Sequence, residues 1–356
     1  MKIKDIIVLA VGLLMCVCIV GCGQQEDVCK IGVIYPLTGM AGSMGQEFYR
    51  GVQMAIDEAK DKGANVELYV EDSKTDSKVA VAAYHSLRAR GVKVILTTVT
   101  GCASAIIPMA KRDGILMFAD VAKPNITDAY ENLFRHSSTA GQEADVIVSK
   151  MHEGASVGLL WMHDEYCLSL RETIKMRAKD LDVQLIDVAF DKENDVVSSV
   201  QSLLKALPKK CEDIVVVGFG APLGKSIKRL RESGYDGRIY TNMGLAVTAD
   251  ARNMIGDKVD KLWYTNMIFD RSAQIFTDYK ERFIKRFGSE PNDYSLLSHN
   301  TASLVVEAVS RQKKWTPRST SRTIVEMQEY IAVGETMQIL RTRDVLPTVA
   351  VVNDPL

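Results

Sequence analysis

The hydrophobic pattern after the first thirty residues alternates between two kinds of segment. Short apolar runs rich in Val and Ile, of the kind that form buried strands, are separated by longer stretches in which apolar residues recur at helical spacing. In the stretch 48–59 the apolar positions fall at i, i+4, i+7, i+8 and i+11, which puts them on one face of a helix. Strands that alternate with helices are typical of a parallel sheet covered by helices, so the pattern predicts an α/β fold.

The expected strands form two series, because the alternation restarts after residue 135 as if from the beginning. Two doubly wound units in series predict two lobes with a central cleft, joined by crossover strands, and ligands bind beyond the carboxyl ends of the strands in such sheets. We place lobe I at 29–137 plus 268–335, and lobe II at 138–267 plus 336–356. The expected strands are 29–35, 66–70, 92–98, 115–119, 157–161, 184–190, 213–218, 238–240, 262–265 and 346–352, and the clearest later helices are 168–179, 196–206, 273–286 and 294–309.

The N-terminal stretch has a different pattern. Its apolar run at 6–20 is shorter than the roughly 20 residues that span a bilayer, and it fits a signal peptide. The run ends in IVGC at 19–22, which resembles a bacterial lipobox, in which the cysteine thiol receives a lipid before cleavage. We predict a cleaved lipoprotein signal peptide at 1–21, lipidation of Cys22 and a polar tether at 22–28. An ordinary cleaved signal or a membrane anchor is the alternative.

Composition excludes several classes of protein. The 356 residues are 47% hydrophobic and 25% charged, with 44 basic and 45 acidic side chains, which describes a globular and nearly neutral chain. Disordered and multi-pass membrane proteins fit this profile poorly. A near-zero charge balance offers no field to attract phosphate, so we expect no nucleic-acid partner. A basic stretch at 311–322 is open to two interpretations, a solvated connection or a contact with a membrane or partner.

Four of the seven cysteines lie beyond the N-terminal stretch, namely Cys29, Cys102, Cys167 and Cys211. In an oxidising compartment they could pair in three ways or stay free. None of them has the spacing of a metal site, and the five histidines are scattered along the chain. We therefore expect no metal and no cofactor.

Two motifs invite an enzymatic or nucleotide-binding interpretation. GASVG at 154–158 matches the serine-hydrolase elbow, but the elbow needs a strand before the serine and a helix after it, and here the order is reversed. GFGAPLGKS at 218–226 resembles a dinucleotide fingerprint and a phosphate loop. Its glycines are spaced G-x-G-x-x-x-G, and Phe219 stands where a phosphate loop needs glycine. We predict that the protein is not an enzyme.

The loop after the third expected strand, TVTGCAS at 98–104, carries the richest chemistry. Thr100 stands where a helix N-cap is expected, and the glycine after it lets a ligand approach the backbone. Free N–H groups and the positive end of the helix dipole suit a ligand carboxylate. A plain N-cap without a ligand is the alternative.

Several segments taken together match the pattern of one family. They are KIGVIYPLTG at 30–39, Gly45, Gly51, AIDEA at 55–59, VEDSK at 70–74, Phe134, Arg135 and Gly218. In these segments the chain resembles the type I periplasmic solute-binding proteins of the leucine/isoleucine/valine-binding class, over essentially its whole length after the signal peptide. The resemblance implies capture of a small solute outside the cytoplasm and its delivery to an ABC permease driven by a separate ATPase.

The resemblance also implies a set of ligand-binding residues. In that family a serine or threonine and backbone N–H groups hold the ligand carboxylate, in the loop that corresponds here to Thr100, Gly101 and Cys102. The next loop adds a backbone carbonyl and usually a threonine hydroxyl; here it has Lys123 instead of that threonine and is one residue shorter. The other corresponding residues are Val121, Ala122 and Lys123 in that next loop, Tyr166 and Met44 in the cleft, and Phe219, which replaces a tyrosine of the second lobe.

The most important departure from the family's pattern concerns the ligand ammonium. At the position of Met243 the amino-acid binders place an acidic residue that pairs with the ligand ammonium, and methionine cannot do so. Asp120, Asp164, Glu165 and Asn242 are candidates to substitute for it. The half of the site that binds a carboxylate is therefore expected to be kept, and the half that binds an ammonium is open.

These observations predict a lipid-anchored solute-binding component of an ABC importer in the cell envelope. Its expected ligand is a small carboxylate, such as a branched-chain or other amino acid. The alternative function is that of a sensory ligand-binding protein of the same fold, which signals to a partner chain. That the protein is an enzyme is the third hypothesis, and turnover of the bound ligand would support it.

Overall fold

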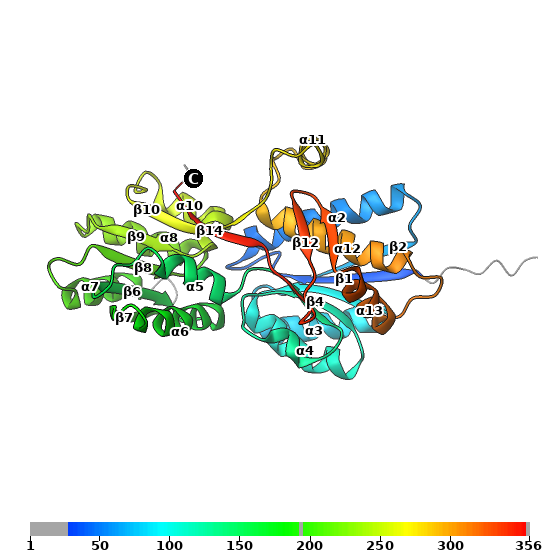
Figure 1. Ribbon diagram of the computed structural model, residues 1–356, viewed down its shortest axis with the longest axis horizontal. Coiled ribbons are helices and arrows are strands. Elements are labelled where there is room, and N and C mark those ends of the chain that lie inside the picture. The colour runs from blue at the N-terminus through cyan, green and yellow to red at the C-terminus, as the bar shows by residue number, and fades with distance from the viewer. Residues whose placement is uncertain (1–27, 192–194, 354–356) are drawn as a thin grey trace, which may run out of the picture.

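The computed structural model describes residues 28–191 and 195–353, and the structural statements below concern that part of the chain. The predicted signal peptide, the lipidation of Cys22 and nearly all of the tether lie outside it. Two six-stranded sheets, one in each lobe, form the frame of the molecule (Figure 1). The predicted two-lobe α/β fold is confirmed.

Lobe I contains a sheet of order β13-β5-β4-β3-β1-β2 in which all neighbouring strands are parallel. Its strands are β1 (Cys29–Tyr35), β2 (Val66–Asp72), β3 (Val94–Thr98), β4 (Leu116–Asp120), β5 (Leu133–His136) and β13 (Asp344–Val345), with a separate hairpin of β11 (Glu329–Ala332) and β12 (Glu335–Gln338). Its helices are α2 (Gly42–Asp61), α3 (Ser77–Ala89), α4 (Thr100–Arg112), the short 3-10 helix η1 (Ile126–Ala129), α11 (Gln274–Phe287), α12 (Asp293–Ser310) and α13 (Pro317–Met327).

Lobe II contains a sheet of order β14-β10-β9-β8-β6-β7, in which only β14 runs antiparallel to its neighbour. Its strands are β6 (Ser156–Met162), β7 (Gln184–Phe190), β8 (Asp213–Val217), β9 (Arg238–Thr241), β10 (Leu262–Ile268) and β14 (Thr348–Val352). Its helices are α5 (Ala140–Val148), α6 (Glu165–Lys179), α7 (Val196–Ala206), α8 (Gly220–Glu232), α9 (Gly244–Val247) and α10 (Ala249–Ile255).

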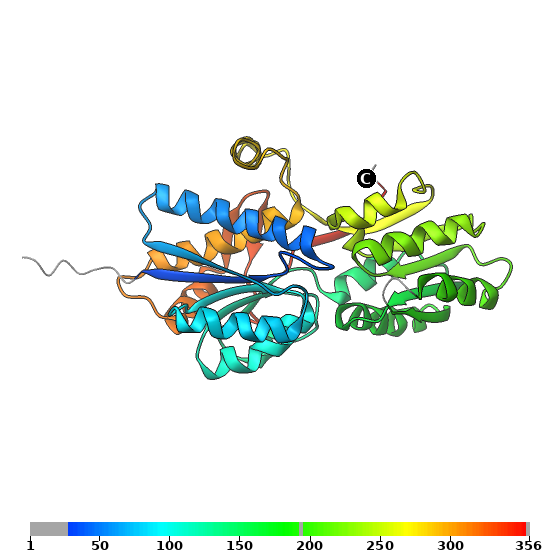
Figure 2. The same ribbon diagram turned by 180° about the vertical axis from the view of Figure 1, so that it is seen from behind.

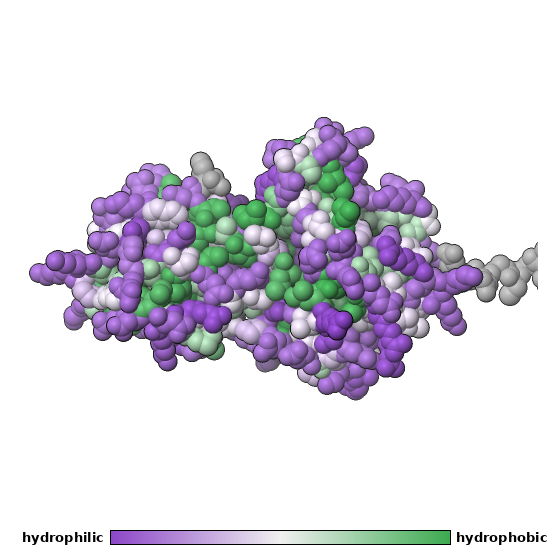
Figure 3. All heavy atoms as spheres, in the orientation of Figure 1, coloured by the Kyte–Doolittle hydropathy of each residue, from purple (hydrophilic) through white to green (hydrophobic). Residues whose placement is uncertain are grey.

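Each lobe has its own hydrophobic core because its sheet is covered on both faces. All five residues of β3 and of β4 are buried, as expected for central strands of a parallel sheet. In lobe I, α2 and α12 are far apart in the sequence but lie side by side on one face of the sheet, and α3 and α4 cover the other (Figures 1 and 2). On the face seen in Figure 3 the surface is largely polar, and apolar side chains gather near the segments that join the lobes.

Two expectations about the C-terminal part of the chain need correction. The predicted boundary at 335/336 lies too early, because β13 pairs with β5 of lobe I and the chain crosses to lobe II only between β13 and β14. The basic stretch at 311–322 is not all connection, because α13 begins inside it. A proline at the first helical position and a capping box of Thr316 and Ser319 explain that start. No described helix has the length and apolar character needed to cross a membrane.

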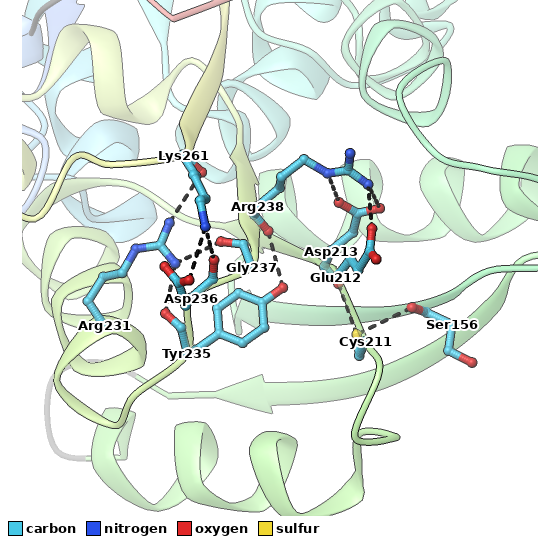
Figure 4. A network of polar contacts seen from close by, with 10 residues as sticks. All are labelled: Ser156, Cys211, Glu212, Asp213, Arg231, Tyr235, Asp236, Gly237, Arg238 and Lys261. Atoms are coloured by element: carbon cyan, nitrogen blue, oxygen red, sulfur yellow. Dashed lines mark hydrogen bonds and ion pairs between the residues drawn. The ribbon is translucent and has the colours of Figure 1, made fainter.

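The end of lobe II remote from the cleft is fixed by a polar network around the amino ends of β6, β8 and β9 (Figure 4). Arg238 donates from Nε and Nη2 to the two carboxylate oxygens of Asp213, at 2.6 and 3.0 Å. The thiol of Cys211 donates to the carbonyl oxygen of Ser156 at 3.3 Å. Ser156, the serine of the hydrolase-like motif, is thus part of a structural network at the amino end of a strand. All four described cysteines are free thiols.

The Arg238–Asp213 pair gives a test of this network. The Asp213 side chain is 3% exposed, so Arg238→Ala leaves a buried carboxylate without its main partner and should lower the free energy of unfolding by about 1–3 kcal/mol. Arg177→Ala is the matched control, because the Arg177–Asp145 pair is exposed on both sides and should contribute below about 1 kcal/mol. Urea denaturation followed by circular dichroism measures both. Equal losses of unfolding free energy in the two variants would show that the buried pair stabilises the fold no more than the exposed pair does.

Candidate functional site

A cavity lies between the two lobes, at the carboxyl ends of the strands of both sheets. Lobe I lines it with residues that follow β1, β3 and β4, and lobe II with residues that follow β6, β8 and β9. The segment between β5 and α5 adds Ser137 and Ser138, and α12 adds Tyr294. The position agrees with the rule that open parallel sheets bind ligands at this edge.

The structure brings seven of the ten residues expected from the sequence to this cavity and leaves three outside its lining. The seven are Met44, Thr100, Val121, Ala122, Tyr166, Phe219 and Met243. Cys102 is instead buried against α3 in the core of lobe I, and Gly101 lies beside Ser77. Lys123 turns to the mouth of the cleft, where it pairs with Glu165.

The start of α4 meets the cavity through Val99 and Thr100. Thr100 is the first residue of the helix rather than its N-cap, because the N-cap is Val99, which has the left-handed φ of 68°. A β-branched residue rarely adopts that angle, so the backbone is strained at this point. The first intrahelical bond is donated by Ala103, at 2.9 Å from the Val99 carbonyl. The N–H groups before it have no helical acceptor, and with the helix dipole they favour an anion.

A directional chain of hydrogen bonds ends on Glu143, a residue of α5 that lines the cavity. The Gly218 N–H donates to Asn242 Oδ1 at 2.9 Å, which leaves Asn242 Nδ2 to donate to the Tyr166 hydroxyl oxygen at 2.8 Å. The Tyr166 hydroxyl in turn donates to Glu143 Oε1 at 3.1 Å. Asn242 accepts with its oxygen and donates with its amide nitrogen, so the Tyr166 hydroxyl oxygen accepts a hydrogen bond and its proton is free to donate to Glu143. A hydrogen bond donated to Glu143 favours its carboxylate form.

Two further donors hold the same carboxylate. Thr265 donates from its hydroxyl to Glu143 Oε2 at 2.8 Å, and the Met243 N–H donates to it at 3.2 Å. Burial raises the pKa of Glu143, and the hydrogen bonds from Thr265, Met243 and Tyr166 oppose that rise. Met243 itself is fixed by the Ser138 hydroxyl, which donates to its sulfur at 3.4 Å. A carboxylate from α5 therefore lies beside the residue at which the resemblance led us to expect an acid.

Asp120, at the end of β4, is a second buried acid of the cavity and is 4% exposed. Neither of its carboxylate oxygens has a side-chain hydrogen-bond partner in the described part of the chain. Burial raises its pKa to about 7, and the charge and the backbone N–H of the neighbouring His136 oppose the rise. His136 is committed elsewhere, since its ring lies 2.9 Å from the Thr301 hydroxyl and 3.1 Å from Glu335. The Asp120 carboxyl group is thus buried, without a side-chain partner, and next to the cavity.

Asp164 is the third acid of the cavity, and it already has a structural task. It is the N-cap of α6 and accepts the Tyr166 N–H at 2.8 Å. No lysine, arginine or histidine belongs to the described lining of the cavity. Of the four residues considered as substitutes for the missing acid, Asp120 and Asp164 line the cavity, whereas Asn242 supports Tyr166 and Glu165 lies at the mouth.

The comparisons with known proteins agree with this fold and site. The family model for the periplasmic binding protein matches residues 28–348. The chain belongs to the periplasmic binding protein family. Two relatives are Leu/Ile/Val-binding protein homologs of Brucella. Homolog 3 of Brucella melitensis is 25% identical over 61% of this chain and 62% of its own length, which is under two thirds of that relative. Homolog 8 of Brucella abortus is 24% identical over 81% of this chain and 77% of its own length.

The fold is also that of a solved structure, the branched-chain amino acid transporter substrate-binding protein LivJ of Streptococcus pneumoniae in complex with isoleucine. The TM-score is 0.80 at 17% identity, and the match covers 91% of this chain and 95% of that one. The resemblance stated from the sequence is therefore confirmed. These proteins bind solutes and are not enzymes, which confirms the prediction that this periplasmic binding protein is not one either.

Sequence reasoning missed Glu143, although one signal for it exists. Ala140, Ala144 and Ile147 form the buried stripe of α5, and Glu143 falls on the same stripe and is fully buried. An acidic side chain on the apolar face of a helix is buried only where hydrogen-bond donors or charges surround it. Such surroundings are common at functional sites, so an acid at this position is a signal for one.

The first prediction from the site concerns Asp120 and pH. Its folded pKa of about 7 lies above the ordinary 3.8, so the folded chain favours the protonated form. That contribution to stability is complete below about pH 4 and is lost as the pH rises through about 7. Asp120→Asn should therefore raise the melting temperature at pH 8, by the equivalent of about 1–3 kcal/mol, and change it less at pH 5. His136 and Tyr35, the titratable neighbours, are present in both proteins. A gain of equal size at both pH values would contradict the assignment.

The second prediction concerns the contact across the mouth of the cleft. Glu165 of lobe II lies 2.7 Å from Lys123 Nζ and accepts the Ser104 hydroxyl at 3.0 Å, both from lobe I. The two charged side chains are about 40% exposed, so the pair should contribute about 0.2–1 kcal/mol, and only when the lobes are closed. Glu165→Gln should weaken ligand binding about two- to fivefold in calorimetry. Asp145→Asn breaks an equally exposed pair within lobe II and should leave affinity unchanged.

Proposed function

We propose that this periplasmic binding protein is an extracytoplasmic solute-binding lipoprotein of an ABC importer, and that it captures a small carboxylate, such as a branched-chain or other amino acid, between its lobes. Family membership implies a location outside the cytoplasm. Lipidation at Cys22 is the proposed means of attachment to the membrane, on the strength of the lipobox-like sequence at 19–22. The importer is proposed because LivJ is a transporter substrate-binding protein and the named relatives are Leu/Ile/Val-binding protein homologs.

The observation that carries the proposed ligand class is the start of α4 at the cavity. The N-cap Val99 and the first helical residue Thr100 both line the cavity, and the N–H groups of the first turn have no helical acceptor. A carboxylate bound there would accept hydrogen bonds without a basic side chain nearby. This is the part of the site that the sequence led us to expect.

The rest of the cavity supports a ligand with an apolar part. Met44, Phe48, Phe219, Met243 and Tyr294 supply thioether and aromatic surface from both lobes. Phe48 and Tyr294 stack with ring centroids 4.6 Å apart, which gives a firm wall. Two or three charge-assisted hydrogen bonds of about 1.5–3 kcal/mol each, with burial of a small side chain, reach about the −8 kcal/mol of micromolar affinity. Binding of this strength needs no catalytic group.

Thr100→Ala tests the anion site. Loss of the hydroxyl next to the first-turn N–H groups should weaken the binding of a carboxylate ligand tenfold or more, since a hydrogen bond to a charged group contributes about 1.5–3 kcal/mol. A thermal-shift screen of amino acids and small carboxylates identifies the ligand, and isothermal titration calorimetry measures the change. Thr100→Ser keeps the hydroxyl and should bind nearly as the unmodified protein does. Unchanged affinity in Thr100→Ala would place the anion site elsewhere.

A further inference from the structure

The basic stretch at 311–322 lies at the end of lobe I that is remote from the cleft. The amino ends of the strands form this end, and two contacts hold the stretch against them. The ammonium of Lys93, the residue before β3, lies 5.9 Å from the centre of the Trp315 ring. Ser321 donates from its hydroxyl to the carbonyl oxygen of Glu131, shortly before β5, at 2.8 Å. The stretch therefore carries its basic side chains to a surface that takes no part in the ligand site.

A groove at this end of lobe I gathers arginines from two separate segments. The charged residues of its described lining are Arg318, Arg322, Arg341, Arg343, Glu131 and Glu326. The four arginines, two from α13 and two from the segment before β13, are termed the basic groove. Lys313 and Lys314 are exposed in the segment that leads to α13 and add to the positive charge of this end. The groove is thus positively charged overall.

Much of this positive charge has no counterpart in the protein. Arg318 pairs with Glu131 at 3.2 Å, and the two side chains are 64% and 62% exposed. Arg343 donates from its guanidinium to two backbone carbonyl oxygens, which orient it and leave its charge in place. Arg322 and Arg341 are exposed, and neither has an ion-pair partner in the described part of the chain. Guanidinium groups suit phosphate, because their planar forks donate two hydrogen bonds to its oxygens.

The chain enters the fold at the same end of lobe I. β1 begins at Cys29, whose N–H donates to the carbonyl oxygen of Asn65 before β2, and α13 lies at this end in both ribbon views (Figures 1 and 2). β5 stands three places from β1 in the sheet, which is about 14 Å at the spacing of adjacent strands. The seven residues 22–28 span at most about 25 Å when extended. A lipid on Cys22 would therefore hold the basic groove close to the headgroups of the membrane.

We propose that the basic groove of lobe I binds the phosphate groups of anionic phospholipids in the membrane to which Cys22 is attached. The inference goes beyond the proposed function, and it rests on the proposed lipid anchor for the position of the groove. Attraction between basic residues and anionic lipids acts within about 10 Å of the surface at moderate salt, so an anchor that brings the groove there is needed. The contact involves lobe I alone, which leaves the lobes free to open and close around a solute.

Vesicle binding tests the groove without the lipid. The mature chain, residues 22–356 with Cys22→Ser, keeps every residue of the described fold. In co-sedimentation at low salt it should bind vesicles of one part phosphatidylglycerol to two parts phosphatidylcholine at least tenfold more tightly than vesicles of phosphatidylcholine alone, because each basic residue at an anionic surface strengthens binding about fivefold. Added salt should weaken the binding. Equal binding to both kinds of vesicle, or binding to neither, would overturn the proposal.

Two double variants assign the binding to the groove. Arg322→Ala with Arg341→Ala should lower affinity for the anionic vesicles tenfold or more and leave the melting temperature nearly unchanged, because neither side chain is ion-paired. Lys209→Ala with Lys210→Ala is the matched control, since both lysines are exposed before β8 at the remote end of lobe II and their loss changes the net charge equally. The control should lose less than about twofold, because distant charges are screened. Equal losses in the two variants would show attraction by net charge alone and overturn the groove.

A soluble phosphate is the other source of the same chemistry. If inorganic phosphate at constant ionic strength raises the melting temperature of the mature chain but not of the arginine variant, and the vesicles do not bind, the groove takes a soluble anion and the membrane contact is overturned. The lipid anchor is tested separately, by incorporation of a labelled fatty acid into the full-length chain and its loss in Cys22→Ala. Absence of the label would overturn the proposed anchor, whereas the vesicle assay alone decides on the groove.

Discussion

The carboxyl ends of both sheets face one cleft, and this constraint decides what the cleft can bind. A helix that follows a parallel strand begins where the strand ends, so α2, α4, α6 and α8 all start at the cavity. Their N-cap residues, Ala41, Val99, Asp164 and Phe219, are all part of its lining. Each start directs the positive end of a helix dipole to the cavity, although Asp164 and Thr248 already accept N–H groups at the starts of α6 and α8. The backbone thus supplies positive potential to a lining that holds no lysine or arginine in the described part of the chain.

The same geometry explains how three carboxyl groups can share a buried site. Asp164 is satisfied by the backbone of the helix that it caps, and Glu143 by side chains and one N–H group from lobe II. Asp120 has no such arrangement, and its raised pKa records the cost of burying it. Stability alone would favour an apolar residue at this position, as it would favour a residue other than valine at the strained N-cap Val99. Unfavourable local features that border one cavity are typical of a binding site.

The sequence was informative wherever a feature depends on local pattern. The bounds of β1, β7 and α7 were predicted to the residue, because each is a run of one periodicity between clear breaks. Thr100 was expected near the ligand because it follows a strand at a helix start, whereas Val121 and Phe219 were expected there because the resemblance implies it; all three line the cavity. The two-residue strand β13 carries no periodicity, and it joins the sheet of lobe I through contacts such as Asp344 with Arg135, 209 positions away. Such contacts lie outside what a local pattern can reveal.

Glu143 illustrates the same limit at the site itself. Its hydrogen-bond partners Met243, Thr265 and Tyr166 are 100, 122 and 23 positions away in the chain. No spacing in the sequence therefore predicts that these four residues meet. Comparison position by position with the amino-acid binders finds a methionine where an acid is expected and suggests that a charge has been lost. In three dimensions a carboxylate from another helix accepts the N–H of that same methionine at 3.2 Å. The electrostatic interaction with a ligand depends on where a charge lies and not on which position of the chain supplies it. Met243 and the buried acid of α5 are therefore neighbours in the fold, although 100 positions separate them in the chain.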